Sequence, residues 1–100
     1  PGALAAPVVA PAPARSDATQ RALDEGRRAL LDAKVAVLSG GEAAAPAAVV
    51  GKLAQARVML DEAGRGDLDE ALDGAIDAAR KKDDARLRAA IDAVLKQLRG

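Results

Sequence analysis

Residues 84–99 read DARLRAAIDAVLKQLR, and large apolar side chains recur in this stretch at Leu87, Ile91, Val94 and Leu98. Steps of three and four residues place these side chains on one face of an α-helix, because the helix turns about once every 3.6 residues. The charged residues between them fall on the other faces. We therefore predict an amphipathic helix over 84–99 that buries its aliphatic side.

The same spacing marks three earlier stretches, and it predicts helices over about 17–38, 46–63 and 67–82. Each predicted helix carries its own apolar face, and in the first one Leu31, Val35 and Leu38 are expected to widen that face. The other expected face residues are Leu23, Gly26, Leu30, Ala33 and Val37 in the first helix, Val49, Leu53, Ala56, Leu60 and Ala63 in the second, and Leu68, Leu72, Ala75, Ile76 and Ala79 in the third.

Residues that commonly start or end helices support these helix limits. Asp17-x-x-Gln20 and Asp67-x-x-Glu70 have the spacing of capping boxes, and Asp83 or Asp84 is expected to cap the last helix. Gly40 and Gly64 follow the first and second helices, where a left-handed glycine commonly ends a helix. Pro46 suits a first turn, because an amide there has no partner within the helix.

Glycine also occurs inside the predicted helices, at Gly26, Gly51 and Gly74. Each costs up to about 1 kcal/mol relative to alanine. Close approach of a neighbouring helix would explain these glycines, and so would the codon usage of a GC-rich genome.

No stretch alternates as a strand would, and the four predicted helices are joined by short loops. The sequence therefore predicts an all-α fold, a small up-down-up-down four-helix bundle over 16–100. An extended, proline-rich arm over 1–15 is expected to precede it.

The predicted arm reads PGALAAPVVAPAPAR. Proline removes amide donors and restricts the preceding residue to extended conformations, so the arm is expected to resemble polyproline II. Its apolar content favours docking on a partner, and the alternative is a leader with no role of its own. The candidate contact residues are Pro7, Val8, Val9, Pro11 and Pro13.

The composition speaks against catalysis. The chain contains no His, Cys or Tyr, so the usual general bases and nucleophiles are missing. Asp69, Asp73 and Asp77 form a stripe four residues apart, which we interpret as a solvated face, with a weak calcium site as the alternative. We predict that the protein is not an enzyme and has no catalytic, cofactor-binding or metal-binding residues.

Charge is balanced overall, with 15 basic and 15 acidic residues, but it is unevenly distributed. Acids dominate 61–77, and bases dominate 80–99. This asymmetry would complement the dipole of the third helix, or it would form a basic patch for an acidic partner. Nucleic acid is not expected as a partner, because no aromatic side chain is present to stack on bases, and no apolar run is long enough to span a bilayer. The candidate contact residues in this patch are Arg80, Lys81, Lys82, Arg86 and Arg88.

A proline-rich segment followed by four short helices resembles the layout of the PsbQ-like extrinsic subunits of photosystem II. The nearest similarity lies in residues 86–100, RLRAAIDAVLKQLRG, which look like the closing helix of that family. Family members usually carry aromatic residues, whereas this chain has none.

The resemblance implies a non-catalytic accessory subunit on the lumenal face of photosystem II that helps to retain ions at the oxygen-evolving centre. It also implies a location in the thylakoid lumen. The alternatives are an exported bacterial helical-bundle adaptor in the periplasm or outside the cell, and a designed helical bundle without an evolved function.

Overall fold

The computed structural model describes residues 16–99, and this range contains helices and no strand. The four α-helices are α1 (Asp17–Ser39), α2 (Pro46–Glu62), α3 (Asp69–Arg80) and α4 (Asp84–Arg99). Two short 3₁₀ helices lie in the connections, η2 (Gly41–Ala44) before α2 and η3 (Gly66–Leu68) before α3. The predicted all-α class is confirmed for the described residues, and the predicted arm over 1–15 lies outside them.

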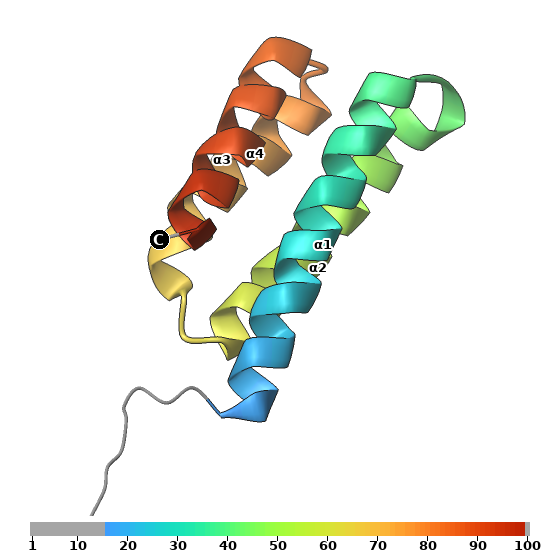
Figure 1. The fold of residues 1–100 in the computed structure, drawn as a ribbon. Coiled ribbons are helices and arrows are strands. Elements are labelled where there is room, and N and C mark those ends of the chain that lie inside the picture. Colours follow the sequence, from blue (N-terminus) through green and yellow to red (C-terminus); the bar gives the residue numbers. More distant parts are fainter. Residues whose placement is uncertain (1–15, 100) are drawn as a thin grey trace, which may run out of the picture.

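Successive helices alternate in direction and lie side by side (Figure 1). α1 and α2 form one hairpin, α3 and α4 form a second, and α2 packs against α3. The packing between α1 and α4 is the sparsest of the four neighbouring pairs. The interface between α1 and α4 is therefore the least closely packed one in the fold.

All four helices contribute to one aliphatic core. Alanines at Ala29, Ala33, Ala56, Ala75 and Ala78 are buried between the larger side chains, so that the helices can approach closely. No polar or charged residue within 16–99 is buried. The largest fully buried side chains are Leu30, Val49, Leu53, Leu60, Leu68, Leu72, Leu87, Ile91 and Val94.

The residue that caps α1 lies one position earlier than the sequence indicates. Ser16 is the cap, and its Oγ accepts the amide of Thr19 at 3.0 Å. The prediction that Asp17 caps this helix is wrong, because Asp17 already lies in the first turn. At the other end Gly40 adopts φ 75° and donates its amide to Ala36 O.

α2 begins at Pro46 in the first turn, as expected, and ends in a turn with Gly64 at φ 80°. The expected start of the third helix at Asp67 is wrong, because residues 66–68 form the 3₁₀ helix η3 and α3 begins at Asp69. The Asp67 carboxylate is bound by the Arg65 guanidinium at 3.1 and 3.2 Å and so does not cap α3.

α3 ends at Arg80, two residues before the expected limit at Lys82. Lys82 adopts φ 58°, which turns the chain out of the helix. The Asp83 amide then donates to Ala78 O at 2.9 Å, and this bond closes the turn. Asp83 Oδ1 accepts the Arg86 amide at 3.2 Å, which assigns the cap of α4 to Asp83 rather than to Asp84.

Candidate functional site

The residues predicted to contact a partner fall into two groups. Those of the predicted arm, Pro7 to Pro13, lie outside the described residues. The five basic residues lie around the turn from α3 to α4, and all of them are exposed. The structure therefore brings the basic group together on one end of the molecule.

Asp77 binds two members of this basic group. Its Oδ2 lies 3.1 Å from Lys81 Nζ and 3.1 Å from Arg86 Nη1. These hydrogen bonds hold the pKa of the Asp77 carboxyl below its ordinary value. Lys81 and Arg86 therefore fasten the end of α3 to the start of α4, whereas Arg80, Lys82 and Arg88 form no ion pair with a described side chain.

The other two members of the acidic stripe on α3 face α2. Arg57 Nε lies 3.5 Å from Asp69 Oδ1 and 3.5 Å from Asp73 Oδ1. One arginine of α2 is thus shared by two carboxylates of α3. The stripe is therefore not a purely solvated face, because each of its three members lies beside a cation.

A third carboxyl group, that of Asp61 at the end of α2, lies against Asp69. A side-chain hydrogen bond with Asp69 raises the pKa of Asp61, and some loss of hydration and the negative charges of Asp69 and Asp73 act in the same direction. The positive charge of Arg57 opposes this shift. Among the described residues, no group of three or more carboxylates is arranged to hold a metal ion.

The second candidate surface consists of aliphatic side chains that the core leaves uncovered. Leu31, Val35 and Leu38 are 45%, 60% and 60% exposed, and we refer to them as the α1 stripe. The prediction that they widen the buried face of the helix is wrong. α2 and α4 cover the side of α1 that carries Leu23 and Leu30, and they leave the stripe in contact with solvent.

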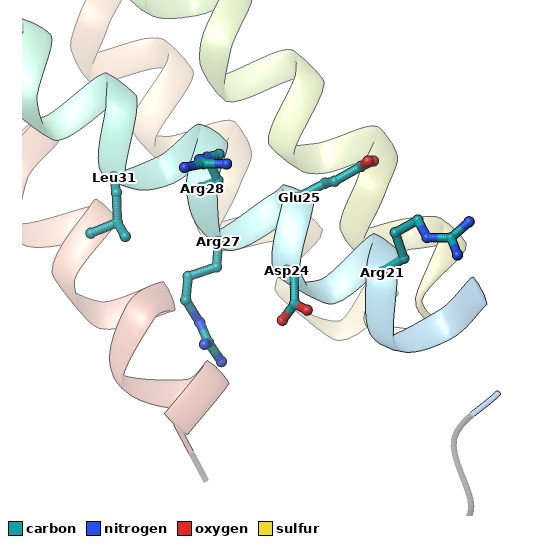
Figure 2. A pocket seen from close by; sticks show the side chains of 6 residues that line it. All are labelled: Arg21, Asp24, Glu25, Arg27, Arg28 and Leu31. Atoms are coloured by element: carbon teal, nitrogen blue, oxygen red, sulfur yellow. The ribbon is translucent and has the colours of Figure 1, made fainter. Parts of the chain in front are cut away.

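Two shallow depressions adjoin the α1 stripe. One, of about 300 Å³, lies on α1 and is lined by Leu31 and by charged side chains that include Arg27 (Figure 2). The other, of about 460 Å³, lies between α1 and α4 and is lined by Arg27, Leu31, Leu95 and Arg99. We refer to this second depression as the α1–α4 groove.

Arginines dominate the rim of the α1–α4 groove. Arg27 Nη2 donates to Leu98 O at 3.4 Å, and Figure 2 shows its side chain reaching toward the end of α4. Arg99 forms no ion pair with a described side chain, and neither does Arg28, which lines the first depression on α1. Farther along, Lys34 Nζ lies 2.6 Å from Asp92 Oδ1, which ties α1 to α4 with a neutral pair.

Sequence reasoning missed this surface, although the sequence contains a signal for it. Val35 lies about 140° around the helix axis from Leu30, and Leu31 lies about 100° from it. The apolar arc of α1 is therefore wider than two neighbouring helices cover, and part of it has to remain exposed.

Comparisons of the chain with known protein families, with curated proteins and with solved structures find no match. Within the described residues, no helix combines the length and the apolar character that crossing a membrane requires.

Proposed function

We propose that this chain is a non-catalytic accessory subunit that binds a larger protein complex through its surface. The observation that carries the proposal is the exposure of Leu31, Val35 and Leu38 on one face of α1. Aliphatic side chains that are grouped on a surface and bordered by charge are typical of interaction sites. The basic residues at the turn from α3 to α4, and the apolar residues Pro7 to Pro13, are the other candidate contacts.

Two observations support the non-catalytic part of the proposal. The sequence has no His, Cys or Tyr, and the clustered carboxylates of α3 lie against Arg57, Lys81 and Arg86. Lys81 and Arg86 lower the pKa of Asp77, and a carboxylate with a lowered pKa is a weak general base. The fold favoured by the alternating helices is an up-down-up-down four-helix bundle, which serves here as a scaffold for the surface.

The partner that the resemblance suggests is photosystem II, with the chain bound at its lumenal face and located in the thylakoid lumen. There the chain would stabilise the oxygen-evolving centre without ligating its ions. The resemblance of residues 86–100 to a PsbQ-like closing helix supports this form of the proposal. The alternatives are an exported bacterial adaptor with a different partner, and a designed bundle without an evolved function.

Co-purification of the native chain tests the proposal. We expect the chain to travel with a large complex, and a salt wash to release part of it if the basic residues contribute. Removal of residues 1–15 should also release the chain if those residues bind the complex. A chain that migrates alone in the native extract at low salt contradicts the proposal, and a complex other than photosystem II contradicts its specific form.

A further inference from the structure

We propose that the α1–α4 groove and the adjoining α1 stripe bind an acidic amphipathic helix of a partner protein. This inference rests on the proposed function and names the surface and the chemistry of the partner.

The shape of the surface favours a helix as its occupant. Leu31, Val35 and Leu38 follow one another at steps of four and three residues along α1, so they present a straight row of side chains about 10 Å long. Leu95 of α4 borders the same row across the groove. A third helix laid along two antiparallel neighbours inserts its own apolar row between them. The stripe therefore matches a partner helix with apolar residues at the same spacing.

The charge around the stripe selects an acidic partner. Arg27 and Arg99 line the groove itself, and Arg28 lines the neighbouring depression on α1. Arg88 lies on the same face of α4 as Leu95, seven residues before it, and it forms no ion pair with a described side chain. The nearby acids Asp24 and Glu25 offset only part of this charge, and Asp92 is neutralised by Lys34. A partner with carboxylates flanking its apolar row complements this rim.

The composition of the chain allows such binding to be measured by fluorescence. It contains no Trp, Tyr or Phe, so the fluorescence of a single Trp in a probe peptide reports on the peptide alone. The probe is a helical peptide of about 14 residues, or ~21 Å of helix, with Leu at i, i+4 and i+7, Glu on the flanks and one Trp at its end. A second peptide with Lys in place of Glu is the matched control for charge.

The full chain is titrated with both peptides, and we expect it to prefer the acidic one. The triple variant Leu31→Ser, Val35→Ser and Leu38→Ser should bind the acidic peptide at least about tenfold more weakly, because three apolar contacts are lost. The control is Val58→Ser, which removes an aliphatic side chain of similar exposure (53%) from α2 and should leave the affinity unchanged. Circular dichroism verifies that each variant keeps its helices.

The arginines are tested separately. The double variant Arg27→Gln and Arg99→Gln should lose the preference for the acidic peptide and most of the salt dependence of its binding. Lys52→Gln, which neutralises an exposed lysine of α2, is the control and should retain both.

Several results would overturn the inference. Equal affinities of the stripe variant and the wild type do so directly. Binding to anionic phospholipid vesicles without binding to the peptide assigns the surface to a membrane, and self-association that is lost in the stripe variant assigns it to a second copy. Peptide binding that appears only after removal of residues 1–15 assigns the groove to that segment.

The inference and the proposed function fail in different ways. A native complex that keeps the stripe variant overturns the inference and leaves the proposed function standing. Groove-specific binding of the acidic peptide by a chain that forms no native complex supports the inference and counts against the proposed function.

Discussion

Gly26 of α1 lies directly against Leu60 of α2, so closely that a β-carbon at position 26 would come within 2.8 Å of the Leu60 side chain. Leu60 is fully buried, so its branch has no solvent-filled space into which it could swing. The absence of a side chain at Gly26 is therefore what sets the distance between α1 and α2 at this level.

Gly26→Ala should lower the free energy of unfolding by about 1–2 kcal/mol, because the overpacking penalty exceeds the gain in helix propensity. Gly51→Ala and Gly74→Ala are the controls, since an added β-carbon at either position has no neighbour within 4 Å. These two changes should raise stability by about 0.5–1 kcal/mol each. Urea unfolding followed by circular dichroism measures all three, and stabilisation by Gly26→Ala would contradict the close approach.

Lys82→Gly should stabilise the protein by about 1 kcal/mol, because glycine adopts the left-handed conformation without a steric cost. Lys82 is the only residue other than glycine with positive φ among the described residues, at 58°. Gly64→Ala is the converse change, at φ 80°, and should destabilise by a similar amount. Thermal unfolding of both variants measures the effects, and a shift of the same sign in both would contradict the account of these two turns.

Ser16→Ala should cost about 1 kcal/mol, because it removes the acceptor for the Thr19 amide at the start of α1. Asp17→Ala should cost less, since Asp17 contributes only its charge to the first turn. Hydrogen exchange of the first-turn amides compares the two variants. A larger effect at Asp17 than at Ser16 would restore the capping box that the sequence suggested.

Asp77→Asn should destabilise the protein at neutral pH, because it removes the partner of Lys81 and Arg86. The folded pKa of Asp77 is lowered, so its contribution is present above the unfolded pKa and is lost as the pH falls through the folded value. The stability difference between variant and wild type, measured by urea unfolding from pH 7 to pH 2, should therefore shrink in acid. A difference that is independent of pH would show that the ion pairs contribute nothing.

Asp61→Asn should behave in the opposite way. The folded pKa of Asp61 is raised, so proton binding favours the folded state, and this contribution is lost as the pH rises through the folded value. The variant should therefore be at least as stable as the wild type at pH 7, and its relative advantage should disappear in acid. A variant that is less stable at pH 7 would indicate that attraction to Arg57 outweighs the repulsion from Asp69.

The sequence predicts the buried faces well, because helical periodicity and burial have the same cause. Leu53, Leu72 and Ile91 all lie where their spacing places them, and all are fully buried. The interior glycines are harder to interpret, because only the packing distance distinguishes Gly26, which is needed for close approach, from Gly51, which faces open space.

The wrong predictions have a common physical origin, because each depends on which other group a side chain or a helix face contacts in the fold. Asp67 has the spacing of a cap, but its carboxylate binds the guanidinium of Arg65, two residues before it, and not a backbone amide of α3. Spacing along a helix favours a pair between Asp92 and Lys96, which are four residues apart on α4, whereas in the structure Asp92 pairs with Lys34 of α1. The exposure of the α1 stripe is a related miss. The wide apolar arc of α1 indicates that part of it stays exposed, but which part depends on the sides of α1 that the other helices cover.

The central claim is that the α1 stripe is a surface that a partner protein covers. Photocrosslinking in the source cells tests it most directly, with a benzophenone amino acid placed at position 35 in one chain and at position 58 in another. Both positions are exposed aliphatic sites on neighbouring helices. We predict one discrete crosslinked protein from position 35 and none from position 58. The same products from both positions, or none from position 35, would contradict the claim.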